Sequence, residues 1–312
     1  MAAPRPAMAD GPFRLGTRRS PLALVQAELA RAALMATHGW AADAVVLVPV
    51  VASGDRVQDR ALAELGGKAL WTRELDQCLA TGRIDAAVHS GKDVETVRPT
   101  AIALAAALPR ADVRDVLVGA DDLWALPDGA RVGTSSPRRS AQLLALRPDL
   151  SIVLMRGNVH TRLAKLAAGE ADATLLAKAG LDRLGLTVGV PLAVEELLPA
   201  PAQGAIVLEC RAEDDAARAA LAAVSHAATF DAVRMERAVL DQLGADCRSP
   251  VACLAEVEGD RTRLRLELLA LDGTARIADE TRLPTGDEAA AADWAARLLD
   301  RAPPSVRALF AQ

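Results

Sequence analysis

Residues 133–142 read GTSSPRRSAQ, a pattern typical of the turn between a strand and a helix. Ser136 suits the N-cap of that helix, and Pro137 suits its first position, where the missing N–H removes no hydrogen bond. Arg138 and Arg139 follow at once, although cations in a first helical turn oppose the helix dipole by roughly 0.3–1 kcal/mol each. Because the free amides of a first turn attract anions, this stretch predicts an α/β unit whose helix entry faces an anion.

Short apolar strands and capped helices alternate along the chain as far as residue 210. The first helix spans 20–39, with Ser20 as its cap, Pro21 in its first turn and Gly39 at its end. The segments typical of buried strands are 13–17, 44–51, 84–90, 131–135, 151–155, 172–176 and 205–210. This alternation indicates α/β layers around a mainly parallel sheet.

Two stretches of the chain resemble each other, LATGRIDAAVHS at 79–90 and LAAGEADATLLA at 166–177. Each contains a helix end, a glycine and an Asp-Ala step into a strand, which predicts two similar α/β lobes. From about residue 228 the pattern changes to a helix at 229–244, alternating segments typical of antiparallel strands, and an alanine-rich helix at 287–302. That tail is predicted to be a separate α+β domain.

The composition excludes several classes of protein. The chain has 312 residues, 51% hydrophobic and 25% charged, which is typical of a globular protein of two or three domains. A net charge of −5 argues against nucleic-acid binding. The four cysteines show no CxxC spacing and the N-terminus lacks the apolar segment of a signal peptide, so we expect reduced thiols in a cytoplasmic protein. The longest apolar run, AIALAAAL at 101–108, is too short to span a bilayer, so no membrane partner is expected.

Arginines recur at the predicted helix entries. The three clusters are Arg18 with Arg19, Arg138 with Arg139, and Arg156 with Arg162. A single arginine is more often solvated surface charge, but three clusters at helix entries are harder to explain in that way. A guanidinium binds a carboxylate through two parallel hydrogen bonds, and a carboxylate roughly 4 Å away stabilises it by about 4 kcal/mol at an effective dielectric of about 20. The clusters therefore predict a polyanion between two lobes.

The strand at 84–90 ends in HSGKDVE, residues 89–95. The carboxyl ends of parallel strands face the ligand crevice, which places Lys92 and Asp93 there. Amid so much positive charge Asp93 would stay ionised, and it is suited to stabilise a developing cation or to transfer protons. A structural ion pair between these two adjacent residues is the alternative. His89 is expected to be a packed strand histidine rather than a catalyst.

Cys247 lies in LGADCRSPVAC (243–253), in a turn after the helix at 229–244. Among the cysteines it alone has the exposed polar setting of a reactive thiol, although an incidental free thiol is the alternative. Its neighbours act in opposite directions, since Arg248 favours the thiolate and Asp246 disfavours it. The cysteines expected to be buried are Cys78, Cys210 and Cys253.

Taken together and in order, the motifs between about residues 13 and 253 resemble the porphobilinogen deaminase family, also called hydroxymethylbilane synthases. They are TRRSPLAL, LGGKALW, VHSGKD, VGTSSPRR, RGNVHTRL, LAKAGLDRLG, PAQGAIVLECR and the loop around Cys247. The remaining C-terminal residues agree only in their domain pattern. The resemblance implies a transferase of tetrapyrrole (porphyrin and heme) biosynthesis whose partner is the small molecule porphobilinogen.

The resemblance implies two lobes similar to type II periplasmic binding proteins, followed by a C-terminal α+β domain with a small antiparallel sheet. The chain would cross from the first lobe to the second near residue 110 and return near residue 203. The implied boundaries are 12–108 with 204–224 for the first lobe, 112–200 for the second lobe, and 228–312 for the third domain. A monomer is expected.

In this family a dipyrromethane cofactor, built by the enzyme from its own substrate, is held through a thioether, which the resemblance places at Cys247. Four porphobilinogen units add head to tail, each with loss of ammonia, and hydrolysis then releases linear hydroxymethylbilane. Each pyrrole carries two carboxylates, so the growing chain would be the polyanion that the arginine clusters predict.

The resemblance also assigns roles to residues, and it implies no metal. Asp93 would be the catalytic carboxylate that stabilises the cationic azafulvene-like species formed as ammonia leaves, together with Arg18 and Lys92. The residues implied to hold the cofactor are Cys247, Lys92, Thr134, Ser136, Arg138 and Arg139. The residues implied to bind substrate and the growing chain are Arg18, Ser20, Arg156, Arg162 and Arg183. Lys68 and Trp71 would lie on the family's mobile loop.

A few positions depart from the common family pattern. They are Gly91 for methionine, Glu95 for proline, Trp71 for phenylalanine, and Ala245 with Asp246 for a pair of glycines. None removes a charged catalytic group. Glu95 is expected to add negative charge near Asp93, and Asp246 is expected to raise the pKa of the Cys247 thiol.

A rival function from another class is a solute-binding protein for small anions, which a two-lobed pattern alone would allow. That function predicts neither a reactive Cys247 nor a third domain. A nucleic-acid-binding regulator is disfavoured by the acidic balance and by the absence of a basic helix-turn-helix pattern.

Overall fold

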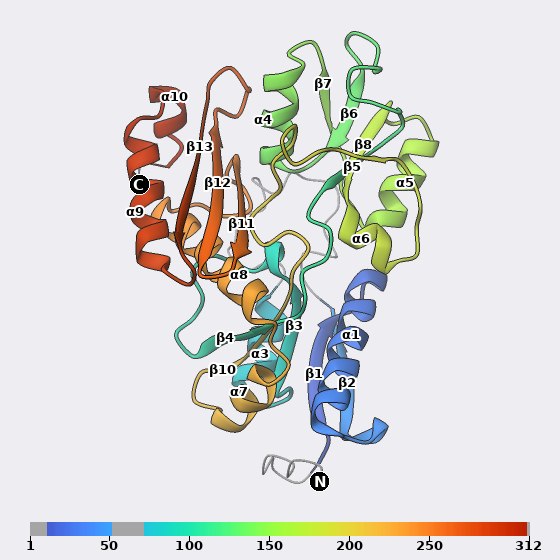
Figure 1. The fold of residues 1–312 in the computed structure, drawn as a ribbon. Coiled ribbons are helices and arrows are strands. Elements are labelled where there is room, and N and C mark those ends of the chain that lie inside the picture. The colour runs from blue at the N-terminus through green and yellow to red at the C-terminus, as the bar shows by residue number, and fades with distance from the viewer. Residues whose placement is uncertain (1–10, 52–71, 311–312) are drawn as a thin grey trace. The chain divides into compact units, whose positions relative to one another are not determined.

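The computed structural model describes residues 11–51 and 72–310 (Figure 1). Their backbone contacts divide into two units. The first unit holds the described residues 11–51, 72–110 and 205–230, and the second holds 111–204 and 231–310. The chain therefore passes between the units after residues 110, 204 and 230.

The first unit is built on a five-stranded sheet with the order β2-β1-β3-β10-β4. Its strands are β1 (Phe13–Arg18), β2 (Val45–Val50), β3 (Ala86–Ser90), β4 (Ile102–Ala107) and β10 (Ile206–Arg211). Its helical segments are α1 (Pro21–His38), η1 (Ala42–Ala44), α3 (Arg73–Ala80), η3 (Gly91–Asp93) and α7 (Asp215–Ala222). β1 pairs in parallel with β2 and β3, whereas β10 is antiparallel to both β3 and β4.

The second unit repeats this design in a five-stranded sheet with the order β7-β6-β8-β5-β9. Its strands are β5 (Asp115–Val118), β6 (Arg131–Thr134), β7 (Ser151–Leu154), β8 (Ala173–Ala177) and β9 (Val190–Pro191). The helices that follow β6, β7 and β8 are α4 (Pro137–Leu146), α5 (Val159–Ala167) and α6 (Lys178–Arg183). β6 pairs in parallel with β7 and β8, whereas β5 is antiparallel to β8 and β9.

The prediction of mainly parallel sheets is confirmed, with one reversed strand in each. The reversed strands are β10 and β5, and each is the first strand after the chain has passed from the other unit. The parallel rule applies to consecutive strands joined by a helical crossover within one sheet. A strand that the chain enters from the other unit is not subject to that rule. The local sequence pattern therefore could not reveal the direction of that strand.

The core of the first unit forms where α1 covers the sheet. Ala27, Ala30 and Leu34 recur at helical spacing on one face of α1, and all three are fully buried. They belong to one cluster with Leu15 of β1 and Val88 of β3. Burying a leucine side chain contributes roughly 1.5–3 kcal/mol, so this spacing of apolar residues fixes the helix against the strands.

The internal resemblance noted in the sequence is confirmed by an equivalent contact in the two sheets. Asp85, just before β3, accepts a hydrogen bond of 2.7 Å from the backbone N–H of Arg14. Asp172, just before β8, accepts one of 2.7 Å from the backbone N–H of Arg131. Each aspartate also pairs with the guanidinium of the same arginine. The Asp-Ala step therefore attaches β3 to β1 in the first sheet and β8 to β6 in the second.

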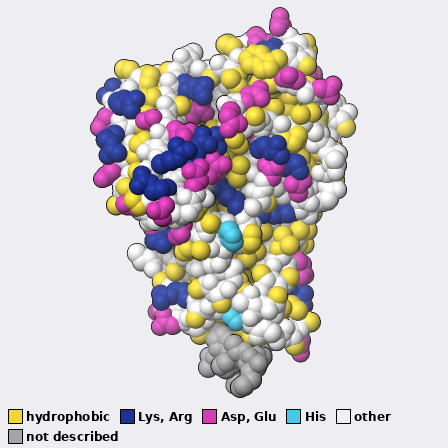
Figure 2. All heavy atoms as spheres, in the orientation of Figure 1, with side chains coloured by type: hydrophobic (Ala, Val, Ile, Leu, Met, Phe, Trp, Pro, Cys, Tyr) yellow, Lys and Arg dark blue, Asp and Glu magenta, His cyan; other side chains and the backbone are white. Residues whose placement is uncertain are grey.

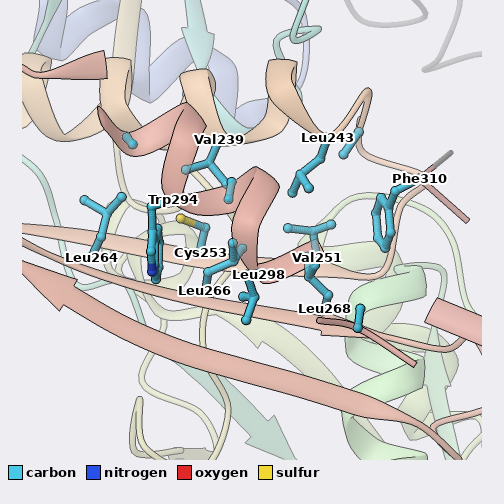
Figure 3. Close-up of a cluster of buried hydrophobic side chains, with 14 of the residues drawn as sticks. Val239, Leu243, Val251, Cys253, Leu264, Leu266, Leu268, Trp294, Leu298 and Phe310 are labelled. Atoms are coloured by element: carbon cyan, nitrogen blue, oxygen red, sulfur yellow. The ribbon is translucent and has the colours of Figure 1, made fainter. Parts of the chain in front are cut away.

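A third, antiparallel sheet follows in the second unit, with the order β11-β12-β13. Its strands are β11 (Val251–Glu258), β12 (Arg261–Leu269) and β13 (Arg276–Pro284), and the helices beside it are α8 (Ala227–Gln242), α9 (Glu288–Asp300) and α10 (Pro304–Arg307). Trp294 of α9 and Val239 of α8 share one hydrophobic cluster with Leu266 of β12 (Figure 3). The predicted fold class, two α/β sheets followed by a small antiparallel sheet with helices, is confirmed.

The solvent-facing side of this third sheet carries paired charges. Arg263 of β12 lies 2.6 Å from Glu280 of β13, and Arg282 lies 3.2 Å from Glu258. In Figure 2, basic and acidic side chains are interspersed over these strands. Alternating charge along an edge strand such as β13 disfavours pairing with another chain.

The predicted caps at Ser20 and Ser136 are confirmed, and Asn158 caps a third helix in the same way. Ser20, Ser136 and Asn158 each accept a hydrogen bond from a backbone N–H in the first turn of the helix that follows. Within the described ranges, we find no helix with the length and hydropathy needed to cross a membrane.

Candidate active site

The first group of predicted site residues gathers at the carboxyl ends of β1 and β3. Asp93 lies in η3, directly after β3, and its side chain is one-third exposed. The guanidinium of Arg18, the last residue of β1, lies 3.5 Å from the Asp93 carboxylate. Because β1 and β3 are neighbours, the sheet brings together two residues that are 75 positions apart. Lys92 occupies the same turn, and Ser20 caps the helix that follows Arg18.

The turn that carries Asp93 is attached to the sheet on its near side. The backbone N–H of Gly91 donates to the carbonyl of Ala205 at 2.9 Å. Ser90 and the buried Gln26 of α1 are joined by a hydrogen bond of 2.9 Å. These contacts fix the end of β3. They therefore also fix the backbone from which the Asp93 side chain extends.

His89 is buried in β3, as predicted, and it is paired with a carboxylate that the sequence analysis did not identify. Its Nε2 lies 3.3 Å from Glu209 of the neighbouring strand β10, whose side chain is fully buried. Burial raises the pKa of Glu209, but the contacts with His89 and Arg98 outweigh it and lower that pKa to about 2. Glu209 is therefore a buried structural anion of β10, opposite Ala87 of β3.

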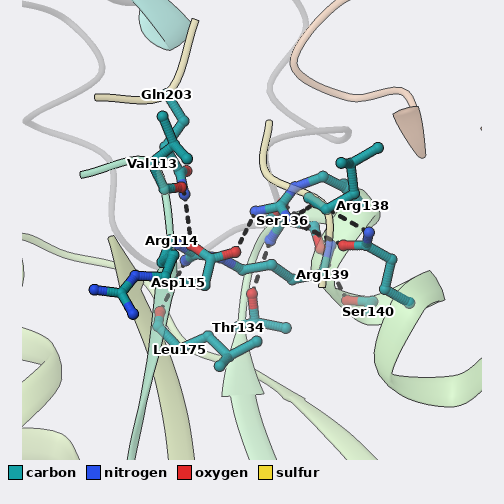
Figure 4. A network of polar contacts seen from close by, with 12 residues as sticks. Val113, Arg114, Asp115, Thr134, Ser136, Arg138, Arg139, Ser140, Leu175 and Gln203 are labelled. Atoms are coloured by element: carbon teal, nitrogen blue, oxygen red, sulfur yellow. Dashed lines mark hydrogen bonds and ion pairs between the residues drawn. The ribbon is translucent and has the colours of Figure 1, made fainter. Parts of the chain in front are cut away.

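The arginine pair of the opening motif is buried, and it converges on one carboxylate (Figure 4). Arg138 and Arg139 lie at the start of α4, and their Nη2 atoms are 2.7 Å and 2.6 Å from the two oxygens of Asp115. Gln203 donates a third hydrogen bond to Asp115, at 2.8 Å. From the sequence, these guanidinium groups are expected to be neutralised by a ligand, whereas in the structure Asp115 is an internal partner of both.

Two cations thus share the carboxylate of Asp115. Burial lowers the pKa of Arg138, and the positive charge of Arg139 lowers it further, while Asp115 raises it. Within the described part of the chain, the buried Nε atom of neither arginine has a hydrogen-bond partner. Buried donors without a partner are rare in proteins, so this pair is suited to bind an additional anionic group.

The third sheet supports α4 from outside. Gln142 of α4 accepts a hydrogen bond of 2.9 Å from Arg138 and donates one of 2.5 Å to Glu267 of β12. Gly273, in the turn between β12 and β13, has a φ of +73° and lies so close to α4 that a Cβ there would be 2.5 Å from the backbone N of Ala145. The position of the arginine pair therefore depends on the C-terminal sheet.

The remaining predicted binding residues of the second unit lie at the ends of β6 and β7 or in the helices α5 and α6. Thr134, the last residue of β6, accepts a hydrogen bond of 3.1 Å from the backbone N–H of Ser136. Arg162 of α5 lies 3.4 Å from the hydroxyl of Ser135. Arg156 is buried in the loop after β7. Arg183, the last residue of α6, donates to the carbonyl of Gly204 at 2.8 Å, and burial lowers its pKa.

Cys247 is exposed in the turn after α8, as expected for a reactive thiol, and the other three cysteines are buried. Its charged neighbours bind each other, because Asp246 accepts hydrogen bonds from the backbone N–H of Arg248 at 2.8 Å and from its Nε at 2.9 Å. The hydrogen bond to Asp246 is the main cause of a raised pKa of Arg248. The two opposing charges that the sequence places beside the thiol thus form an ion pair.

Two other expectations concern the family's mobile loop and the charge near Asp93. The predicted mobile-loop residues Lys68 and Trp71 lie outside the described residues. Glu95, expected to add negative charge near Asp93, lies 2.9 Å from Arg98 and accepts a hydrogen bond of 2.7 Å from Thr72. Its charge is therefore compensated by an arginine that the sequence analysis did not identify.

Comparison with known proteins places these features in a family context. Residues 13–219 match the family model described as "Porphobilinogen deaminase, dipyromethane cofactor binding domain", and residues 230–300 match "Porphobilinogen deaminase, C-terminal domain". The chain is 58% identical over 309 residues to a porphobilinogen deaminase of Sphingopyxis alaskensis, covering 97% of this chain and 98% of that protein. It is 51% identical over 299 residues to a porphobilinogen deaminase of Paracoccus denitrificans, covering 94% and 96%.

Two solved structures show a distant likeness to this chain. The VFT2 domain of BvgS from Bordetella pertussis is 16% identical, with a TM-score of 0.42 over 68% of this chain and 85% of that one. The ligand-binding component of an ABC-type import system from Staphylococcus aureus is 16% identical, with a TM-score of 0.39 over 74% and 73%.

Proposed function

The chain belongs to the porphobilinogen deaminase family, and from this premise we propose that the residues described above form the active site of a hydroxymethylbilane synthase. The enzyme is a transferase of tetrapyrrole biosynthesis, and porphobilinogen is the substrate of its family. The observation that carries this conclusion is the identity of 58% to a porphobilinogen deaminase over 97% of the chain. Four porphobilinogen units are joined head to tail with loss of ammonia, and hydrolysis releases the product.

The charge of the substrate explains the proposed binding residues. Each porphobilinogen carries two carboxylates, so an oligomer of pyrroles needs many cations within a protein whose net charge is −5. Arginine suits this task because its fork engages a carboxylate with two hydrogen bonds. The residues proposed to bind substrate and growing chain are Arg18, Ser20, Arg156, Arg162 and Arg183.

The proposed role of Asp93 follows from its place beside Arg18. A partly exposed carboxylate at the end of β3 is able to accept hydrogen bonds from pyrrole N–H groups and to stabilise the positive charge that develops on the substrate as ammonia leaves. Lys92 in the same turn contributes a second cation for the carboxylates of the bound chain.

The residues of the second unit fit the dipyrromethane that the family implies. When bound, this cofactor supplies a covalent primer for chain growth. We propose that the exposed sulfur of Cys247 holds it through a thioether. The buried Nε donors of Arg138 and Arg139, which lack acceptors within the described ranges, are matched to a carboxylate arm of such a group. Thr134 and Ser136 are also proposed to hold its arms, as is Lys92 of the first unit.

At the level of the whole chain, we propose a cytoplasmic monomer that acts on a small molecule. The domain boundaries proposed are 12–108 with 204–224, 112–200, and 228–312. Light scattering of the purified protein measures the oligomeric state directly, and a dimer at micromolar concentration would contradict the monomer.

The sharpest test of the site is the intact mass of the purified protein. We expect a covalent increment of two pyrrole units, which the Cys247→Ser variant lacks because it has no thiolate to form the thioether. Cys78→Ala is the matched control, since it removes a buried thiol of α3 and should retain the increment. An unmodified mass in native protein that turns over porphobilinogen would contradict the assignment of Cys247.

A further inference from the structure

Arg98 lies five positions after Asp93, and nothing in the proposed chemistry uses it. We propose that Arg98 is a positioning residue that holds the Asp93 turn through Glu95 and Glu209. This inference rests on the proposed role of Asp93, and its test below separates the two.

The guanidinium of Arg98 donates to carboxylates through two pairs of nitrogen atoms, Nε with Nη2 and Nη1 with Nη2. On one edge, Nε and Nη2 donate to the two oxygens of Glu209 at 2.9 Å and 2.8 Å. At its end, Nη1 and Nη2 donate to the two oxygens of Asp76 at 3.1 Å and 2.5 Å. Nη1 also donates to Glu95 at 2.9 Å. The Arg98 side chain is 8% exposed, so these contacts are largely shielded from water.

These three carboxylates come from three different parts of the first unit. Glu209 is on β10, where it faces Ala87 of β3 in the sheet. Asp76 is on α3, and Glu95 follows Asp93 by two residues. Arg98 therefore ties the segment after Asp93 to a strand on one side and to a helix on the other.

The Asp93 turn is thereby held on both sides by the segment that contains β10. Before Asp93, Gly91 donates to the carbonyl of Ala205, immediately ahead of β10. After Asp93, Arg98 binds Glu209, within β10. A catalytic group placed between two such attachments has little freedom to move, and a misplacement of about 1 Å costs on the order of 100-fold in rate.

Charge strengthens this arrangement. Glu209 remains ionised although it is fully buried, because His89 and Arg98 both stabilise its anion. The pKa of Arg98 is lowered by burial, but Glu209 and Asp76 raise it well above its ordinary value. The contact between Glu209 and Arg98 is therefore a buried ion pair between a carboxylate and a guanidinium.

A lysine cannot replace this geometry. Its ammonium is a point charge and cannot form two bidentate pairs, one with Glu209 and one with Asp76. The variant Arg98→Lys thus keeps the charge and removes the fork. Glu95→Gln keeps the size of the side chain and weakens the contact between Arg98 and Glu95, beside Asp93.

The experiment compares these two variants as holoenzymes. We expect Arg98→Lys to lower kcat by about 10- to 100-fold, with KM within about threefold of native and with full loading of dipyrromethane by intact mass. We expect Glu95→Gln to lower kcat several-fold in the same pattern. Kinetics are measured well below the Tm of each variant, so that loss of folded protein does not contribute.

Arg211→Lys is the matched control. Arg211 is on the same strand as Glu209, pairs with Asp214, and donates to the carbonyls of Leu79 and Ile84 at 3.1 Å and 3.0 Å. It should lower Tm as Arg98→Lys does, yet leave kcat within about twofold of native. A purely structural role for Arg98 predicts the same outcome for both arginines.

The inference is overturned if folded Arg98→Lys and Glu95→Gln both retain kcat within about twofold of native, or if they raise KM alone. If Arg98→Lys does not fold, the kcat of Glu95→Gln alone tests the inference. Asp93→Ala separates this inference from the proposed function. If Asp93→Ala is inactive and Arg98→Lys is fully active, only the positioning role of Arg98 is contradicted. If Asp93→Ala is active, the proposed role of Asp93 itself is contradicted.

Discussion

Asp115 is enclosed by two guanidinium groups and the amide of Gln203, and its side chain is fully buried. In the sequence it is a single acid in the stretch VRDVL, with no periodicity or motif that marks it. The partner that two arginines share is set by the pairing of β5 with β8, which no local pattern records. Asp93 and Arg18 were easier to predict, because both stand at the ends of recognisable strands.

Asp115→Asn tests whether this carboxylate organises the arginine pair. Removing one partner of a buried ion pair leaves charge uncompensated, so we expect unfolding free energy to fall by about 3–5 kcal/mol and dipyrromethane loading to fall with it. Urea denaturation and intact mass measure the two effects. Asp112→Asn is the control, because Asp112 and Arg114 form a partly exposed pair in the same segment, and such pairs contribute about 0–1 kcal/mol. Native-like stability and loading in Asp115→Asn would refute the role.

Glu209 makes a second prediction at this scale, concerning acid stability. Its pKa is lowered from 4.5 to about 2 in the folded protein, so its stabilising effect is present above pH 4.5 and is lost as pH falls toward 2. The loss amounts to about 3 kcal/mol at most. Urea denaturation at a series of pH values should show this decline in the native protein and a weaker one in Glu209→Gln. Equal slopes in the two proteins would contradict it.

Helices and strands were predicted far better than the contacts between them. The caps at Ser20, Ser136 and Asn158 carry their own local signal, since a side-chain oxygen must precede the apolar face of the helix. The antiparallel pattern after residue 250 was also evident from alternation. The direction of β5 and β10 was not, because it depends on where the chain enters each sheet.

The turn between β12 and β13 offers a test of how elements dock. Gly273→Ala should lower unfolding free energy by about 1–3 kcal/mol more than Gly259→Ala. Both glycines have a φ of +73°, so both substitutions carry the same backbone strain. A Cβ at Gly273 meets α4, whereas a Cβ at Gly259 has nothing within 4 Å. Thermal denaturation of the two variants isolates the contribution of the contact between the turn and α4 to stability. Equal losses of stability in the two variants would show that this contact does not contribute.

For the whole molecule, the motifs of the first 253 residues identified the family, and comparison confirmed it over nearly the full chain. Composition contributed mainly exclusions, since a net charge of −5 says nothing about where arginines gather. The supporting residues were missed as a class. Asp115, Glu209 and Arg98 act on other side chains, and a residue of that kind has no signature until its partners are placed beside it.

The reversed strand in each unit also bears on how the polypeptide emerges from the ribosome. The sheet of the second unit uses residues 115–191 without interruption, so it can close as soon as they are made. The sheet of the first unit lacks the strand between β3 and β4 until residues 206–211 appear. The first unit begins to be translated before the second, yet its sheet is completed later. A nascent chain released before residue 206 would expose the unpaired edges of β3 and β4 in that sheet.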